Sequence, residues 1–170
     1  DGDVRFDETK FGSGDVWFVK TVFGNGSVSF DKSEFGDGIV SFSEAIFGNG
    51  SVWFHGASFG NGNVVFNNAN FGTGTISFDN ARFDNGAVSF EHVSFGEGSV
   101  LFDCTQFGTG TVSFDGAEFD NGDIFFVGTD FGNGDLSFDQ ARFGSGTVSL
   151  AGAKSLSGNV RFDDVSFQSA

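Results

Sequence analysis

The sequence predicts an all-β chain wound into a solenoid, and three observations predict this fold class. Phenylalanine recurs at alternating steps of five and seven residues from Phe6 to Phe167. These steps define a twelve-residue unit, V-x-F-D-x-A-x-F-G-x-G-x, which runs from Val4 through fourteen copies without insertion or deletion, the last copy one residue short. The composition, with 27 Phe, 28 Gly and no Pro, favours strands and tight turns over helices.

A twelve-residue unit is too small to bury its own apolar face, so its stability must come from stacking on its neighbours. We therefore expect residues 1–170 to form one solenoid of fourteen repeats. Solenoids usually carry polar caps at their ends, and no separate cap can be read in this sequence.

The spacing of apolar residues within one copy predicts two corners. Val28 and Phe30 stand two residues apart, as do Ser33 and Phe35, so each pair points to one side of a strand. The alternation shifts by one residue between Phe30 and Ser33, and a corner at residues 31–32 lets both pairs point inward. The same shift recurs across the glycine-rich residues 36–39. A chain with these two corners winds around a core.

Hairpins are the alternative to winding. Six Asn-Gly pairs, at 25–26, 49–50, 61–62, 85–86, 121–122 and 133–134, are typical of two-residue hairpin turns. The shifted alternation argues against hairpins. The glycine of this pair recurs in all thirteen copies of the turn, whereas the residue before it varies, and a positive φ at a solenoid corner explains that pattern.

The length of one coil follows from the space inside it. A coil of one repeat would force two Phe, a Val and an Ala into a very flat interior. A four-sided coil of two repeats, about 24 residues, leaves room for stacked Phe columns together with Val and Ala or Thr. At ~4.8 Å between stacked strands, seven such coils make a rod of ~34 Å, whereas fourteen flat coils would make one of ~67 Å.

The triplets at 45–47, 57–59, 69–71 and 81–83, each Ala-x-Phe, resemble the small-x-large core of pentapeptide-repeat proteins. The resemblance covers Val4 to Phe167 and implies a right-handed, four-sided β-helix lined by these residues. Some members of that family are acidic rods that resemble duplex DNA and occupy its site on gyrase or topoisomerase. The chain departs from the family pattern because every second face spans seven residues, with Val or Ile where the family often has Ala.

The charge of the chain restricts its partners. Eight Lys and Arg against 23 Asp and Glu give 8 − 23 = −15, which repels phosphate backbones and anionic lipid surfaces. No apolar run is long enough to span a membrane. We therefore expect neither direct nucleic-acid binding nor membrane insertion, and the expected partners are other copies of the chain or another protein.

One stretch, Asp84 to Asp139, carries eleven acidic residues and no Lys or Arg. It predicts either an acidic contact surface for a protein partner or a solvated surface that maintains solubility. Its members are Asp84, Glu91, Glu97, Asp103, Asp115, Glu118, Asp120, Asp123, Asp130, Asp135 and Asp139.

Acidic residues also follow the first Phe of the unit in eight copies, which predicts a charged ridge that a partner could bind. They are Asp7, Asp31, Asp79, Glu91, Asp103, Asp115, Asp139 and Asp163. The simpler interpretation is turn chemistry, since an Asp side chain readily accepts a hydrogen bond from a backbone N–H two residues on.

Four large apolar residues, Trp17, Trp53, Leu101 and Phe125, lie between the two inner residues of a V-x-F triplet and are therefore predicted to point outward as candidate contacts. One copy, residues 148–159, departs from the pattern, with Leu150 and Ser155 where Phe is expected. Leu156, one place later, is expected to fill the gap through a local bulge.

No motif in the sequence predicts catalysis, a cofactor or a metal. The G-x-G turns lead into strands rather than helices, so they are not phosphate-binding loops. His55 and His92 occupy different columns with no ligand cluster at metal spacing, and Cys104 stands beside Asp103, which disfavours a thiolate.

These observations predict a non-catalytic structural or binding rod that stacks end to end into a filament or forms part of a longer repeat protein. The alternative is an acidic DNA mimic that inhibits DNA gyrase or topoisomerase, and the third is an ice-binding solenoid with a flat Ser/Thr face. The chain opens with Asp1 rather than Met and has no recognisable caps, which leans toward a secreted or extracellular location.

Overall fold

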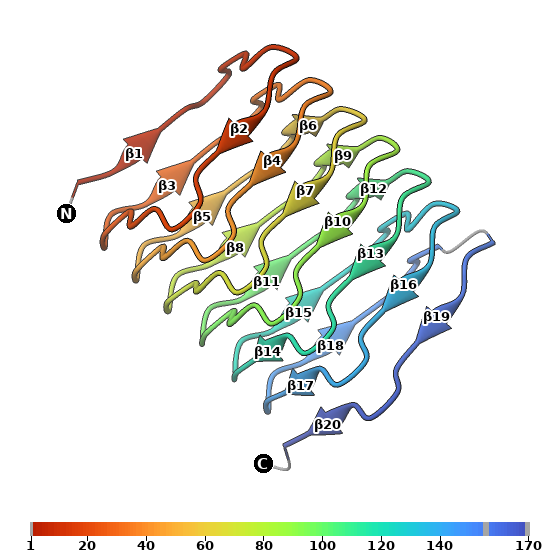
Figure 1. Ribbon diagram of the computed structural model, residues 1–170. Helices are drawn as coiled ribbons and strands as arrows, with labels where there is room; N and C mark the ends of the chain where they lie inside the picture. Colours follow the sequence, from red (N-terminus) through yellow and green to blue (C-terminus); the bar gives the residue numbers. More distant parts are fainter. Residues whose placement is uncertain (1, 155–156, 169–170) are drawn as a thin grey trace.

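The computed structural model describes residues 2–154 and 157–168 and shows a parallel β-solenoid of about 7 coils (Figure 1). The coils lie one behind another, with the N-terminus at one end of the stack and the C-terminus at the other. The elements of the described part are all two-residue strands, without a helix among them. The predicted all-β solenoid is confirmed.

The strands line up in four ladders along the stack. Ladder 1 contains β1 (Val4–Arg5), β3 (Val28–Ser29), β5 (Val52–Trp53), β8 (Ile76–Ser77), β11 (Val100–Leu101), β15 (Ile124–Phe125) and β18 (Val148–Ser149). Ladder 2 contains β2 (Val16–Trp17), β4 (Val40–Ser41), β7 (Val64–Val65), β10 (Val88–Ser89), β13 (Val112–Ser113), β16 (Leu136–Ser137) and β19 (Val160–Arg161).

The other two ladders combine strands with single bridges. Ladder 3 runs through Lys10, Glu34, β6 (Ser58–Phe59), β9 (Arg82–Phe83), β12 (Gln106–Phe107), Asp130 and Lys154. Ladder 4 runs through Val22, Ile46, Asn70, Ser94, β14 (Glu118–Phe119), β17 (Arg142–Phe143) and β20 (Ser166–Phe167).

The register of the ladders sets the coil length. Val4 pairs with Val28, and Val16 pairs with Val40, so each strand meets its equivalent two repeats later. Every pairing between the named strands is parallel, which excludes the hairpin alternative. The coil of about 24 residues is confirmed, and the coil of one repeat is wrong. Four ladders are what a four-sided coil requires; the right-handed winding stays a prediction.

The core consists of phenylalanine columns. Phe30 stacks on Phe54 with 4.9 Å between ring centroids and 1° between ring planes, and Phe35 stacks on Phe59 in the same way at 4.7 Å. The Phe columns that follow ladders 1 and 2 meet edge to face at the centre of each coil, as Phe30 and Phe42 do at 5.4 Å and 80°. Both arrangements are favourable for aromatic quadrupoles. The predicted interior of stacked Phe with Val and small residues is confirmed.

Hydroxyl groups at the small inner positions are satisfied inside this core. The Thr105 hydroxyl donates to the carbonyl of Phe78 at 2.7 Å, and the Thr129 hydroxyl donates to that of Phe102 at 2.6 Å. Both threonines are fully buried. Within residues 2–154 and 157–168, no buried side-chain nitrogen or oxygen lacks a hydrogen-bond partner. Thr and Ser can therefore replace Ala here without the cost of an unpaired polar group.

The short corner, the two residues after the first Phe of each copy, is a tight turn. The Ser33 N–H donates to the Phe30 carbonyl at 3.1 Å, and Lys32 has a φ of 55°. A positive φ at the third residue is the signature of a type II turn. All fourteen copies share it, at Glu8, Lys20, Lys32, Glu44, Gly56, Asn68, Asn80, His92, Cys104, Gly116, Gly128, Gln140, Gly152 and Asp164.

The long corner, the G-x-G-x segment, uses its two glycines differently from the prediction. The first glycine has a positive φ in six copies, for example 68° at Gly36. The second glycine, expected to need a positive φ, has none at any of its positions, all of which the structure describes. Instead, a Cβ on Gly50 would collide with the backbone carbonyl of Gly26, one coil earlier. Glycine recurs at this position because two backbones approach too closely for a side chain.

The irregular copy lies at the C-terminal end of the stack. Leu150 takes the place of Phe in its column and is half exposed. Ser155 and Leu156, on which the expected bulge depends, lie outside the described residues.

Candidate functional site

The two ends of the rod expose the cross-section of the core. Phe6, Phe11, Phe18 and Phe23 in the first coil are only partly buried, whereas their equivalents in the next coil are fully buried. At the other end Phe167 is 69% exposed. In the part of the chain that the structure describes, neither terminal coil is covered by another element (Figure 1). Both ends therefore present apolar rings and unpaired strand edges.

Acidic side chains at the corners link successive coils. The Asp31 carboxylate accepts a hydrogen bond from the His55 N–H at 3.0 Å, and the Asp103 carboxylate accepts one from the Val127 N–H at 2.9 Å. Each donor stands two repeats after its acceptor. The expected bond to a backbone N–H two residues on is therefore wrong for these corners, and Asp130, bonded to the Gly132 N–H, is an exception on ladder 3.

These corner carboxylates form two separate columns rather than one ridge, because alternate copies lie on opposite sides of the coil. Asp7, Asp31, Asp79 and Asp103 follow ladder 1, whereas Glu91, Asp115, Asp139 and Asp163 follow ladder 2. The stacking of like charges has an electrostatic cost, and hydrogen bonds to the next coil offset it.

Burial changes the proton affinity of two of these carboxylates. Desolvation is the largest influence at Asp31 and at Asp79, and it raises the pKa of both side chains despite the hydrogen bond from the next coil. Asp37, on a long corner, is exposed and behaves in the opposite way. Hydrogen bonds from the backbone and side chain of Asn61 lower the pKa of Asp37.

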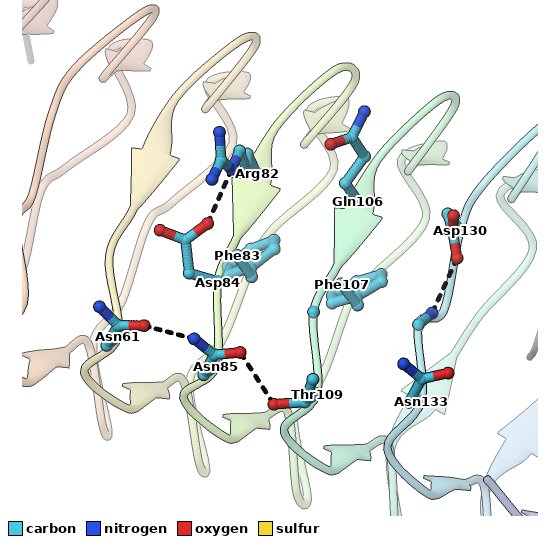
Figure 2. A pocket seen from close by; sticks show the side chains of 12 residues that line it. Asn61, Arg82, Phe83, Asp84, Asn85, Gln106, Phe107, Thr109, Asp130 and Asn133 are labelled. Atoms are coloured by element: carbon cyan, nitrogen blue, oxygen red, sulfur yellow. Dashed lines mark hydrogen bonds and ion pairs between the residues drawn. The ribbon is translucent and has the colours of Figure 1, made fainter. Parts of the chain in front are cut away.

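Polar side chains on the long corner after ladder 3 form a second hydrogen-bonded column (Figure 2). The Asn61 side chain donates to Asp37 at 2.8 Å, the Asn85 side chain donates to Asn61 at 2.6 Å, and the Thr109 hydroxyl donates to Asn85 at 2.9 Å. Each bond joins one coil to the next. The column stabilises the stack, and its mixture of Asp, Asn and Thr does not form a uniform Ser/Thr face.

Two hollows on the described surface are shallow and open to solvent. The one in Figure 2 measures about 460 Å³ and contains the ion pair between Arg82 Nε and Asp84 Oδ1, 2.7 Å apart. Its other lining side chains are amides, Phe rings, Thr109 and Asp130, with no histidine or cysteine among them. A second hollow, of about 500 Å³, lies beside Trp53 and His55. Across residues 2–154 and 157–168, no three His, Cys, Asp or Glu side chains converge to hold a metal ion.

The acidic stretch between Asp84 and Asp139 does not form one patch. Seven members lie on the side of ladder 4 and its adjoining corners, namely Glu91, Glu97, Asp115, Glu118, Asp120, Asp123 and Asp139. The other four, Asp84, Asp103, Asp130 and Asp135, lie on the side of ladder 3. Three arginines pair with members of the stretch: Arg82 with Asp84, Arg142 with Glu118, and Arg161 with Asp139.

The predicted outward apolar residues divide between two ladders. Trp53, Leu101 and Phe125 lie on ladder 1, where Leu101 pairs directly with Phe125, and all three are half-buried. Ser77, between Trp53 and Leu101 on that ladder, is only 2% exposed because its larger neighbours flank it. Trp17 lies apart on ladder 2 and is 59% exposed.

Sequence reasoning missed a set of exposed apolar residues near the N-terminal end. Val22 is 68% exposed, and Val19 and Ile46 are also exposed. Val22 and Ile46 are the middle residues of small-x-Phe triplets and bridge to each other on ladder 4. Their spacing of two repeats is the signal that would have found them. With Trp17 they make the rim of the first coils apolar.

No helix in the described residues could cross a membrane. No protein-family model matches the chain, and no curated protein matches it. Among solved structures, it is similar to HetL, a pentapeptide repeat protein involved in heterocyst differentiation regulation from the cyanobacterium Nostoc. The match has 12% identity and a TM-score of 0.27, and it covers 97% of this chain and 87% of HetL.

Two trypsin-treated forms of QnrB1, a plasmid-mediated fluoroquinolone resistance protein, also match. The first has 10% identity, a TM-score of 0.28 and coverage of 99% of this chain and 92% of that one. The second has 16% identity, a TM-score of 0.22 and coverage of 90% and 88%. At these TM-scores the likeness says nothing about function.

Proposed function

We propose that the chain is a non-catalytic rod that binds further copies of itself through its two open ends. The observation that carries this proposal is the apolar cross-section at each terminal coil: four partly buried Phe side chains in the first coil, and exposed Leu150, Phe162 and Phe167 in the last, against fully buried Phe rings in the coils between. An uncovered cross-section of a solenoid is an apolar patch bordered by strand edges, and both features favour association.

The distribution of charge favours contact through the ends over contact through the sides. The whole chain carries −15, so rods lying side by side repel one another. The last coil is different, since Lys154 and Arg161 balance Asp163 and Asp164, giving 2 − 2 = 0 for residues 148–168. Association end to end therefore buries the most apolar surface with the least electrostatic repulsion.

Sedimentation velocity over a series of protein concentrations tests this function. We expect the sedimentation coefficient to rise with concentration as rods join, and electron micrographs of the same samples to show rods of increasing length. A single monomeric boundary at every concentration would overturn the proposal.

A matched pair of variants locates the contact. Phe167→Glu places a charge on the exposed ring of the last coil and is expected to abolish the concentration dependence. Asn70→Glu adds the same charge to an exposed position in the middle of ladder 4 and is expected to leave it unchanged. Equal behaviour of the two variants would mean that the ends are not the contact.

The acidic side of the rod supports a second candidate function. Seven carboxylates of the Asp84–Asp139 stretch lie on the ladder 4 side, where Arg142 pairs with Glu118 at 2.9 Å. The excess negative charge favours a basic protein partner, and the resemblance to pentapeptide repeats suggests gyrase or topoisomerase. A supercoiling assay with gyrase tests this function. Inhibition of gyrase that becomes weaker as salt is added supports it, and full supercoiling in the presence of excess protein overturns it.

A further inference from the structure

We propose that Asn49, followed by Gly50, is a modification site at which the folded chain loses ammonia from a side chain and its backbone rearranges. The chain contains six Asn-Gly pairs, and all six asparagines are exposed at the middle of a long corner. Because the two residues of every pair are the same, differences in their reactivity report the structure around them. The six asparagines are Asn25, Asn49, Asn61, Asn85, Asn121 and Asn133.

The reaction needs only the chain and water. The glycine backbone nitrogen gives up its proton to solvent and attacks Cγ of the preceding asparagine, which forms a C–N bond and closes an imide ring. The bond from Cγ to the side-chain nitrogen breaks, and this nitrogen takes a proton from solvent and leaves as ammonia. Water then adds to one of the two ring carbonyl carbons, returns a proton to the ring nitrogen and gives aspartate or isoaspartate. Glycine favours the attack because no side chain shields its nitrogen.

The attacking nitrogen is free in all six pairs. Within residues 2–154 and 157–168, none of the six glycine N–H groups donates a hydrogen bond to a backbone carbonyl. The attack therefore breaks no backbone hydrogen bond at these corners. The pairs differ instead in the hydrogen bonds of the asparagine side chain, which must be released before its amide can turn toward the nitrogen.

Two asparagines on the ladder 3 side are held at both ends of the side-chain amide. The Asn61 amide nitrogen donates to Asp37 at 2.8 Å. The Asn85 amide nitrogen donates to the Asn61 oxygen at 2.6 Å, and the Asn85 oxygen accepts from the Thr109 hydroxyl at 2.9 Å (Figure 2). Each of these two amides must break two hydrogen bonds before it reacts. We therefore expect both asparagines to be protected.

The remaining asparagines are held less firmly. The side-chain oxygens of Asn25, Asn121 and Asn133 accept hydrogen bonds, but their amide nitrogens donate none in the part of the chain that the structure describes. Asn49 donates through its backbone N–H to Asn25, and its side chain makes no hydrogen bond with any described residue. The geometry therefore makes Asn49 the pair member that is most free to react.

Deamidation at Asn49 would disturb the stack because of where this corner lies. Isoaspartate carries the chain through the side chain and lengthens the backbone by one carbon atom. A Cβ on Gly50 would collide with the Gly26 carbonyl one coil earlier, so the corner has no room for a longer backbone. The aspartate product keeps the acceptor oxygen and adds a negative charge to a chain that carries −15. Modification therefore loosens the contact between these two coils.

Peptide mass spectrometry measures the six rates in one sample. The folded wild type is incubated in mildly alkaline buffer and digested in acid, and each Asn-Gly peptide is followed by the gain of about one dalton when OH replaces NH₂. We expect Asn49 to react first, and Asn61 and Asn85 to react at least about tenfold more slowly because two hydrogen bonds must break. In denaturant the six rates should converge.

Three results would overturn the assignment. One is an equal rate at all six pairs of the folded protein. Another is a pair that reacts faster than Asn49, or no conversion at Asn49. The third is an order of rates that persists in denaturant, because it would show that the local sequence sets the reactivity instead of the fold.

A matched pair of threonine variants tests the cause of protection. Thr109→Val removes the donor to the Asn85 oxygen and keeps the shape of the side chain. Thr73 stands two repeats after Asn49, as Thr109 does after Asn85, and both threonines are exposed. Thr73→Val is therefore the control. We expect Asn85 to react several-fold faster in Thr109→Val and Asn49 to keep its wild-type rate in Thr73→Val. An unchanged Asn85 rate would contradict protection by hydrogen bonds.

Asn49→Ser tests the consequence for the stack. Serine occupies the same place in other copies, at Ser13 and Ser145, and cannot form the imide. After incubation we expect the wild type to melt at a lower temperature than before, and Asn49→Ser to keep its melting temperature for longer. An equal loss in both proteins would show that modification of this corner does not loosen the stack.

Discussion

The Asp31 carboxylate accepts a hydrogen bond of 3.0 Å from the backbone N–H of His55, the residue at the same corner one coil later. Repeated at other corners, this bond attaches each coil to the next with a side chain as well as with the strand ladder. It places a carboxylate where burial raises its pKa, so the interaction combines a favourable hydrogen bond with a desolvation cost.

Replacing Asp31 and Asp79 by Asn is expected to preserve or raise thermal stability at pH 7. The pKa of both groups is raised in the folded state, so the unfolded chain ionises first as pH rises through the ordinary value of 3.8, and stability falls until the folded groups ionise too. Asn keeps the acceptor oxygen and removes this loss. Melting temperatures measured between pH 3 and pH 7 should therefore decline less with pH in the double variant.

Asp37→Asn is the control, because the pKa of Asp37 is shifted in the opposite direction. The pKa of Asp37 is lowered by hydrogen bonds from Asn61, so its contribution to stability is present above the ordinary pKa and is lost as pH falls below it. The variant should lose stability at pH 7 and converge with the wild type in acid. A pH profile of the same shape for both variants would contradict this assignment.

Gly50→Ala should be one of the most destabilising single substitutions in the chain. Its Cβ would overlap the Gly26 carbonyl, and a backbone atom in a stacked coil cannot move aside cheaply. We expect a loss above about 3 kcal/mol or failure to fold. Gly14→Ala, in the same column but without a preceding coil, should change the free energy of unfolding by less than about 1 kcal/mol. Denaturant unfolding of the two variants under monomeric conditions compares them.

Phe66→Ala should cost about 3–5 kcal/mol because it opens a cavity in the fully buried core. Phe66 stacks on Phe42 at 4.9 Å and on Phe90 at 5.0 Å. Phe167→Ala removes the same side chain from the exposed end of its column and should cost much less. Similar unfolding free energies for the two variants would mean that the rings do not form a buried core.

Substitutions of Cys104 test the turn type of the short corner. Its φ of 56° is unfavourable for most residues, and the same column holds Gly56 and Gly128. Cys104→Gly should be nearly neutral, since relief of that strain and the greater entropy of an unfolded glycine are each about 1 kcal/mol. Cys104→Val, with a branched Cβ, should lower the melting temperature. Equal melting temperatures for Gly and Val would argue against a type II turn at this corner.

The alternation of apolar residues along each copy predicted most of this fold. The alternation shifts by one residue between Phe30 and Ser33, which located the short corner, and again after Phe35, which located the long corner. The space that four Phe rings need indicated a coil of two repeats. These features depend on the direction of side chains within one copy, which sequence spacing records directly.

Features that depend on the distance between coils could not be read in this way. The recurring second glycine suggested a positive φ, whereas its cause is the carbonyl one coil earlier, as at Gly50 and Gly26. Asp31 suggested a bond two residues on, whereas its donor lies one full coil away. The Asp84–Asp139 stretch suggested one surface, but consecutive copies face opposite sides and divide it.

Cryo-electron microscopy of filaments formed at high protein concentration is the most direct test of the central claim. Seven coils per copy stacked end to end at ~4.8 Å predict a continuous Phe-lined rod in which each copy adds ~34 Å of length. Isolated rods at every concentration, or the doubled length per copy that flat single-repeat coils require, would contradict the account.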